Sequence, residues 1–295
     1  MSAGGRGNTA ARVRGRRRVG RAAGRASLVV GAMIVALVVA TAAVSLVWTP
    51  CDPSAMTPLA RFAGPSAAHP FGCDQFGRDV LSRVMAGARP AVLAGVASVT
   101  VGAAVGCALG MAAGMAGPGA RSVVMRVMDG LMAFPGVLLA LMLALVIGRG
   151  LVGTLVAVAV FTVPTFARLC AALTLAERGR PYVTAARSYG RGTASLALTQ
   201  ILPNILPRLV TQLTSSAGVG ILLEASLSFL GLGVQPPQAS WGVMVSEAMQ
   251  YVYTYPTLVV APGCVLVVAV LGFNLLGDGL DGILQEGGEG DGDRR

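Results

Sequence analysis

The chain has 295 residues, of which 54% are hydrophobic and only 12% are charged, with a net charge of +10. This composition excludes an ordinary soluble domain and is typical of a polytopic membrane protein. All 23 basic residues are Arg, so the chain lacks the Lys that a phosphate-binding P-loop requires. The sequence therefore predicts no ATP site and no cofactor here, and any ATP with its Mg²⁺ would be bound by another subunit.

Six apolar spans are expected along the chain. Residues 1–27 carry eight Arg among Gly, Ala and Ser and are expected to be disordered. The next run, 28–48, is the first expected transmembrane helix. A signal peptide is the alternative, but the run is too long for one and no A-x-A cleavage site follows it. Five further spans, each long enough to cross a hydrocarbon core of about 30 Å, are expected at 91–113, 127–148, 152–174, 206–230 and 256–277.

The distribution of Arg orients these spans. The Arg-rich N-terminus predicts a cytoplasmic start, and six spans then place the C-terminus on the same side. The loop 49–90 is expected outside, and its end, from Val80, has the apolar spacing of a short interfacial helix, with Asp79 and Arg83 able to pair at i,i+4. A core of five spans is expected at 91–278, and the Gly-rich acidic tail 279–295 is expected to be solvated.

Cysteine and histidine usage argues against a metal or redox centre. The five Cys occur singly, with no CxxC pair, and His69 is the only His. The sequence therefore predicts no metal site. Cys51 and Cys73 lie in one expected loop, and whether they form a disulfide stays open because spacing alone does not establish the geometry.

A polar interruption at 182–204 separates the fourth and fifth spans, within an expected cytoplasmic loop 176–205. It is composed like two short helices, because Gly190 and Gly192 permit a sharp turn and Pro203 marks a boundary. The spacing resembles the EAA loop of binding-protein-dependent ABC importer permeases, except that Thr184 stands where an acidic residue is usual. The resemblance implies that an ATPase docks on Tyr182, Thr184, Ala185, Ala186, Arg187, Gly190, Leu202 and Pro203.

Further motifs resemble the second permease subunit of dipeptide, oligopeptide and nickel importers. They are HPFG-x-D-x-x-GRD-x-x-SR at 69–83, MD-x-x-x-A-FP at 128–135, EASLSFLGLGVQPP at 224–237 and FNLLGDG at 273–279. The resemblance covers roughly 69–279. It implies an all-α bacterial inner-membrane protein with the six-helix fold of type I ABC importer permeases, and no catalytic activity of its own.

The same resemblance implies four kinds of partner and a substrate class. The partners are a homologous second permease, two ATPase subunits, an extracytoplasmic substrate-binding protein and the lipid bilayer, with no nucleic acid. Short peptides are the expected solute, and nickel or a metal chelate is the alternative.

Three features within or at the ends of the expected spans predict specific side-chain contacts. Glu224 is costly at membrane depth, and it either lines the path, contacts the partner permease or holds the bundle together. The stripe Gly102, Gly106, Gly110 and Gly114 predicts close helix packing, either within the chain or with a partner. Asp129 is expected to pair with Arg126.

Two other classes of protein are weaker interpretations. A secondary transporter would show intramembrane charge networks or inverted repeats, and the sequence shows one firm intramembrane carboxylate and no obvious repeat. A membrane-embedded enzyme would carry a motif such as H-E-x-x-H or G-x-S-x-G, and neither is present.

Overall fold

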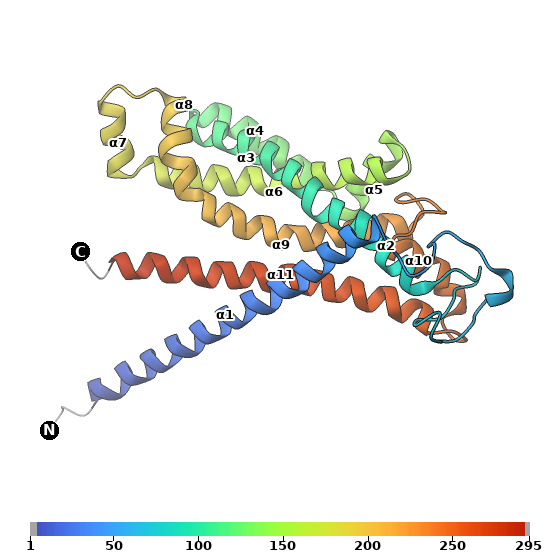
Figure 1. Ribbon diagram of the computed structural model, residues 1–295. Coiled ribbons are helices and arrows are strands. Elements are labelled where there is room, and N and C mark those ends of the chain that lie inside the picture. Colours follow the sequence, from blue (N-terminus) through green and yellow to red (C-terminus); the bar gives the residue numbers. More distant parts are fainter. Residues whose placement is uncertain (1–4, 293–295) are drawn as a thin grey trace.

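The computed structural model describes the backbone of residues 5–292 and the side chains of residues 24–284. It is a bundle of long helices that extend between the same two ends of the molecule, with α1 lying obliquely across the others (Figure 1). Apart from a single β-bridge between Cys73 and Asp79, residues 5–292 contain no strand pairing. The expected all-α membrane-protein fold is therefore confirmed.

The bundle is made of five long helices and several shorter elements. The long helices are α1 (Gly5–Ser45), α3 (Val99–Met115), α6 (Leu151–Arg178), α9 (Leu202–Phe229) and α11 (Thr257–Gly292). The shorter α-helices are α2 (Val80–Val92), α4 (Pro118–Met132), α5 (Gly136–Ile147), α7 (Pro181–Ser188), α8 (Thr193–Leu196) and α10 (Trp241–Ala248). Single-turn 3₁₀ elements are η1 (Pro58–Ala60) and η4 (Met249–Tyr251), and π-helical stretches are η2 (Leu93–Ser98) and η3 (Ala197–Ile201).

Four stretches in the described part of the chain are long and apolar enough to cross a membrane. They are Gly24–Ser45, Val80–Met115, Leu151–Arg178 and Thr257–Leu284. The pair α4 and α5 makes a fifth if it is counted as one broken span. α9 has the required length, but polar residues such as Gln212 and Ser215 lie along it, and it is not one of the four. Length and composition thus support four or five spans, and six remains a prediction.

The expected span 127–148 is not one helix. α4 and α5 meet at an angle of 91° across the break at 133–135. The reason is Pro135, which lacks an N–H to continue the ladder of α4 and adopts an extended ψ of 128° before α5 starts. The expected single span is therefore completely broken at Pro135.

The expected boundary at residue 90 is also moved. α2, η2 and α3 follow one another without a gap, so the interfacial helix at the end of the 49–90 loop is the first part of one helical stretch, Val80–Met115. Pro90 does not end α2, and the wider π-helical turn follows directly after it.

The ends of the chain are more regular than expected. α1 starts at Gly5 and α11 continues to Gly292, so most of the segment expected to be disordered, and most of the expected tail, is helical. A helix already nucleated by its apolar part extends readily through Arg and Ala, which are good helix formers. Residues 1–4 and 293–295, the outermost parts of these two segments, lie outside the described residues.

The glycine stripe packs α3 closely against α6. A Cβ at Gly102, Gly106 or Gly110 would collide with backbone carbonyl oxygens of Ala159, Val163 or Ala167. Gly114 faces the side chain of Thr174 in the same way. The absence of a Cβ at these four positions of α3 therefore lets two helix backbones approach each other within one chain, which is the intramolecular form of the expected packing.

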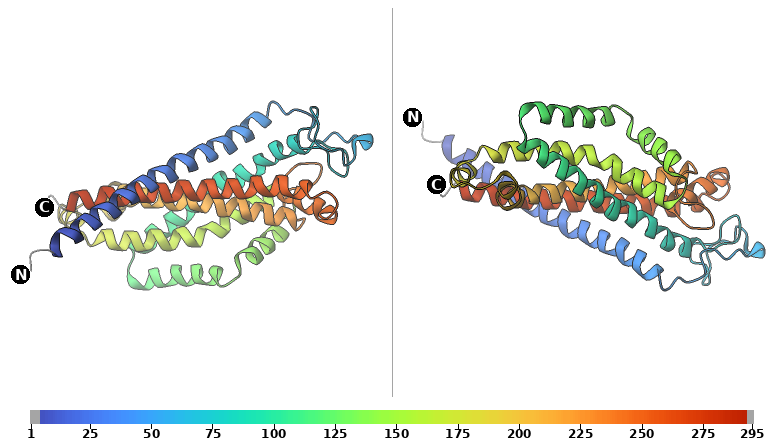
Figure 2. Two further views of the ribbon diagram at one scale, coloured as in Figure 1. Left: turned by 90° about the horizontal axis from the view of Figure 1, so that it is seen from below. Right: turned by 90° about the horizontal axis from the view of Figure 1, so that it is seen from above.

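The two ends of the bundle carry different elements. α7 and α8 lie at the end where α1 begins and α11 finishes, whereas α10 and the loop 46–79 lie at the opposite end (Figure 1). Two further views show the same separation, with α4 and α5 along one flank of the bundle (Figure 2). We call the first the α7 end and the second the α10 end.

Candidate functional site

The expected coupling segment folds as two helices joined by a turn. α7 is followed by residues 189–192, and then α8, η3 and α9 run on as one continuous helical stretch. The second helix of the segment is thus the start of a bundle helix. Leu202 and Pro203, expected near a boundary, lie at the junction of η3 and α9, inside this continuous stretch. The wider π-helical turn comes directly before the position where Pro203 lacks an N–H.

Gly190 occupies the turn with a positive φ of 80°. L-residues with a side chain rarely adopt this region, whereas Gly does so without strain. The space around Gly190 is open, since no atom lies within 4 Å of the position of a Cβ. The glycine is therefore required by the backbone conformation and not by crowding within the chain. Gly192, also in open space, has an ordinary φ of −67°.

Tyr182 anchors α7 to its neighbours. Its hydroxyl donates to Oε1 of Glu177 in α6 at 2.5 Å and accepts from Nδ2 of Asn204 in α9 at 3.0 Å. Partial burial and the hydrogen bond to the Glu177 carboxylate raise the pKa of Tyr182 to about 12. Val183, fully buried, adds an apolar contact to the core between α6 and α9. α7 is consequently attached to two long helices at once.

The remaining docking candidates form an accessible surface on α7. Thr184, Ala185 and Arg187 are exposed, and Ala186 is half-buried. The side chains are small apart from Arg187, so a groove on a partner could approach the helix closely. Arg178, at the end of α6, donates from Nη1 to the carbonyls of Gly114, Met115 and Ala116 and so caps the end of α3.

Glu224 is completely enclosed by its own chain. Its Oε1 accepts hydrogen bonds from Ser228 Oγ and Ser240 Oγ, both at 2.8 Å, and Ser228 Oγ accepts from the backbone N–H of Val234 at 3.0 Å. Oε2 has no hydrogen-bond partner among the described residues. Glu224 thus ties the 230–240 loop to α9, and this geometry favours the bundle-holding role among those left open.

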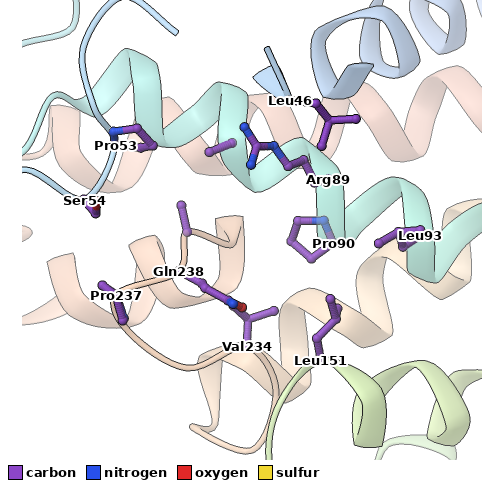
Figure 3. Close-up of a pocket in the computed structure, with 12 residues that line it drawn as sticks. Leu46, Pro53, Ser54, Arg89, Pro90, Leu93, Leu151, Val234, Pro237 and Gln238 are labelled. Atoms are coloured by element: carbon purple, nitrogen blue, oxygen red, sulfur yellow. The ribbon is translucent and has the colours of Figure 1, made fainter. Parts of the chain in front are cut away.

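A cavity of about 420 Å³ opens at the α10 end. It lies between α2, the start of α6 and the 230–240 loop, and Figure 3 shows Arg89 across from Val234 and Gln238. Arg89 Nε donates to Ser45 Oγ at 2.8 Å, which orients the guanidinium. Of the twelve described residues that line the cavity, Arg89 is the sole ionisable one. The cavity therefore presents one fixed cation on mostly apolar walls.

Two ion pairs differ from those expected. Asp129 pairs with Arg168 of α6 and not with Arg126, so the pair joins two helices. Asp79 does not pair with Arg83. Its Oδ2 accepts from Ser82 N–H at 2.7 Å as the N-cap of α2, and its Oδ1 lies 3.0 Å from His69 Nδ1. A capping carboxylate satisfies free N–H groups at the helix start, which an i,i+4 pair would leave unpaired.

Sequence reasoning missed an ionic cluster that fastens the loop to α10. Arg78 Nε donates to Asp74 Oδ2 at 2.6 Å, and Arg78 and Arg83 both reach Oε2 of Glu247. The two Arg side chains are 1% exposed. The motif at 69–83 contains Arg78, but the ionic partner of Arg78, Glu247, is 169 residues away. No local pattern therefore indicated this pair.

Comparison with known proteins decides the family. The family described as "Binding-protein-dependent transport system inner membrane component" matches residues 106–287. The chain belongs to this family. Its matched part runs from α3 to α11 and includes α7, Gly190 and Glu224. It is an ABC importer permease of a binding-protein-dependent system, and the resemblance inferred from the motifs is confirmed.

Relatives agree with this assignment. The chain is 44% identical over 217 residues to the "Glutathione transport system permease protein GsiD" of Escherichia coli O6:K15:H31 (strain 536 / UPEC) and of Shigella boydii serotype 4 (strain Sb227). It is 46% identical over the same length to the protein of that name from Shigella flexneri serotype 5b (strain 8401). Each match covers 74% of this chain and 72% of the relative.

Proposed function

We propose that this permease imports short peptides as one half of a two-permease path. Two ATPase subunits would power it from the cytoplasm, and an extracytoplasmic binding protein would deliver the solute. The observation that carries the peptide assignment is the similarity to permeases named for transport of glutathione, itself a tripeptide. The α7 end would then be cytoplasmic, as would both termini, because ATPases dock from that side.

The structure suggests how ATPase movement would reach the solute. A displacement of the turn at 189–192 acts directly on the continuous helical stretch from α8 to α9. At the far end of α9, Glu224 and Ser228 hold the 230–240 loop through hydrogen bonds of 2.8 and 3.0 Å. That loop lines the cavity beside Arg89. A displacement of the docking helix α7 would therefore move the cavity wall, which lies about one helix length from it.

The cavity also bears on the choice between peptides and nickel. A peptide or glutathione carries at least one carboxylate, for which the Arg89 guanidinium is a suitable partner. A bare Ni²⁺ would need imidazole, thiolate or carboxylate ligands, and the described lining contains none of them. The cavity thus favours a carboxylate-bearing solute.

The test is uptake by the transporter assembled with its own partners in membrane vesicles. We expect ATP-dependent uptake of labelled short peptides that unlabelled peptides inhibit, and that Ni²⁺ does not. Arg89→Gln should lower peptide uptake by about tenfold, the loss of one charge-assisted hydrogen bond. Arg149→Gln, an exposed Arg at the same end of the bundle, is the matched control and should transport normally.

Three results would contradict the proposal. They are uptake that persists with an ATPase subunit unable to hydrolyse ATP, competition by Ni²⁺ but not by peptides, and equal uptake by the Arg89→Gln and Arg149→Gln variants. The first would indicate a secondary transporter, the second the metal alternative, and the third a path that avoids the cavity.

A further inference from the structure

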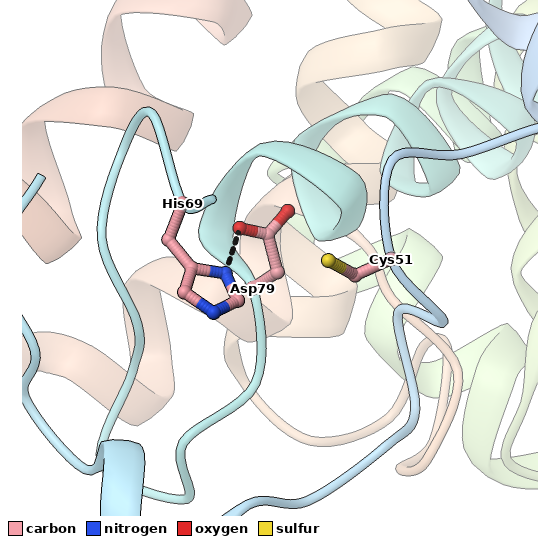
Figure 4. A group of neighbouring side chains, drawn as sticks. All are labelled: Cys51, His69 and Asp79. Carbon is pink, nitrogen blue, oxygen red and sulfur yellow. Dashed lines mark hydrogen bonds and ion pairs between the residues drawn. The ribbon is translucent and has the colours of Figure 1, made fainter. Parts of the chain in front are cut away.

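Three potential metal ligands meet at the α10 end, outside the cavity described above. The Sγ of Cys51, a ring nitrogen of His69 and a carboxylate oxygen of Asp79 all lie within 4.8 Å of one another. They come from the segment after α1, the 49–79 loop and the N-cap of α2. Figure 4 shows Asp79 between the His69 ring and the Cys51 thiol. His69 and Asp79 belong to the motif at 69–83, whereas Cys51 lies outside it, and no familiar metal-ligand spacing relates the three residues.

The surrounding hydrogen bonds hold two of the ligands in place. Asp79 Oδ2 accepts from the N–H and Oγ of Ser82 at 2.7 and 2.6 Å, which leaves Oδ1 facing His69. Ser82 Oγ also accepts from the backbone N–H of Cys51 at 2.9 Å. One fully buried hydroxyl therefore positions both Cys51 and Asp79. Outer-sphere hydrogen bonds of this kind orient the ligands of protein metal sites.

The three ligand atoms are close enough for a single ion to bind all of them after small side-chain movements. Zinc bonds of about 2.0–2.3 Å place neighbouring ligand atoms roughly 3.3–3.6 Å apart. Asp79 Oδ1 and His69 Nδ1 are already 3.0 Å apart, so an ion would replace the proton they share, and a side-chain rotation of Cys51 would complete the set. The His69 side chain is 28% exposed, which leaves a fourth position open to water.

We propose that Cys51, His69 and Asp79 bind a divalent transition-metal ion, with Zn²⁺ as the best-matched ion. A mixed sulfur, nitrogen and oxygen set suits Zn²⁺ and excludes Mg²⁺ and Ca²⁺, which prefer oxygen alone. The ion would join three segments at the α10 end and so stabilise the loop 46–79 at the start of α2. This proposal departs from the expectation of no metal site, which treated His69 as isolated.

Cys73 provides the matched control. It lies in the same loop but is not one of the three ligands. The Cys73 side chain is buried, and burial disfavours the charged thiolate relative to the neutral thiol. A protonated thiol is a poor ligand, since metals bind the thiolate.

The test uses the full chain, purified in detergent, freed of metal and kept reduced, and titrated with Co²⁺. We expect saturation at one equivalent, a thiolate-to-cobalt charge-transfer band, and displacement by Zn²⁺. Cys51→Ser should abolish the band and weaken Co²⁺ binding by about tenfold or more. Loss of a residue that only orients a metal ligand already has an effect of about this size. Cys73→Ser should retain both the band and the binding. His69→Gln should weaken Co²⁺ binding, but the charge-transfer band from the Cys51 thiolate should still appear at saturation.

Two outcomes would overturn the proposal. One is the absence of saturable Co²⁺ binding to the reduced wild-type chain. The other is a charge-transfer band that persists in Cys51→Ser or disappears in Cys73→Ser, which would assign the thiolate to another cysteine. Thermal unfolding supplies a readout independent of spectroscopy, because Zn²⁺ should raise the melting temperature of Cys73→Ser but not of Cys51→Ser.

Discussion

Glu247 Oε2 lies 3.2 Å from Nη2 of Arg83, although the two residues are 164 positions apart. Glu247 is on α10 and Arg83 on α2, so this contact fastens the loop that precedes α2 to a helix near the end of the chain. The same oxygen also accepts from Arg78. One carboxylate therefore balances two guanidinium groups whose side chains are 1% exposed.

Removing that carboxylate should destabilise the α10 end. In Glu247→Ala, both arginines would be left with Asp74 as their remaining ionic partner. Breaking a buried pair costs about 3–5 kcal/mol, and Glu247 is 20% exposed, so we expect about 3 kcal/mol. Thermal unfolding of the purified chain measures the effect. Asp52→Ala, an exposed carboxylate in the same loop, should change stability by less than about 0.5 kcal/mol, and equal losses would contradict the expectation.

Two glycine-to-alanine changes should act in opposite directions. Gly106→Ala places a methyl group against the Val163 carbonyl and 2.9 Å from the Phe166 Cβ, so α3 and α6 must separate. We expect a loss of about 1–3 kcal/mol. Gly130→Ala, in α4, meets no atom within 4 Å and should gain up to about 1 kcal/mol from helix propensity. Melting temperatures that shift the same way in both variants would contradict this packing.

The turn glycines give a matched pair for coupling. Gly190→Ala forces a side chain into a backbone with φ of 80°, at a cost of about 1–2 kcal/mol, whereas Gly192→Ala retains an ordinary φ of −67°. Both positions are in open space. We expect Gly190→Ala to weaken co-purification of the ATPase and its response to solute, and larger residues such as Asp or Arg to do so more strongly. Normal coupling in Gly190→Arg would mean that 182–204 is only a connector.

The Tyr182 hydroxyl should contribute to folding stability by an amount that does not vary with pH near neutrality. Tyr182→Phe removes the hydrogen bonds to Glu177 and Asn204, and we expect a loss of up to about 1 kcal/mol. The pKa is raised to about 12 from an unfolded value of about 10, so the neutral phenol is favoured in the folded state. The contribution is complete below about pH 10 and is lost as the pH rises through about 12.

The measurement is the difference in melting temperature between the wild type and Tyr182→Phe across this range. It should stay constant from about pH 6 to about pH 9 and shrink above about pH 10. Tyr189→Phe is the control, since that side chain is 89% exposed and should show little difference at any pH. A wild-type advantage that grows with increasing pH would have the wrong sign for a raised pKa.

Local pattern was enough to establish the class of protein and much of its outline. Apolar runs predicted α1, α6 and α11, because a helix must be apolar over about 20 residues to cross a bilayer. The composition of 182–204, with Gly190 between two helix-favouring stretches, predicted a helix, a turn and a second helix, because helix and turn preferences are properties of neighbouring residues. The glycine stripe predicted close packing for the same reason, since residues four apart lie on one helix face.

Only the tertiary structure decided which side chains meet across the bundle. It paired Glu247 with Arg83 and Asp129 with Arg168, and it placed Cys51 beside His69 and Asp79. These contacts depend on how helices cross and how a loop folds back over them, and no periodicity along the chain encodes either. The sequence alone predicts which face of each helix is apolar or lined with small residues. Which other helix packs on that face is decided by the packing of the whole bundle.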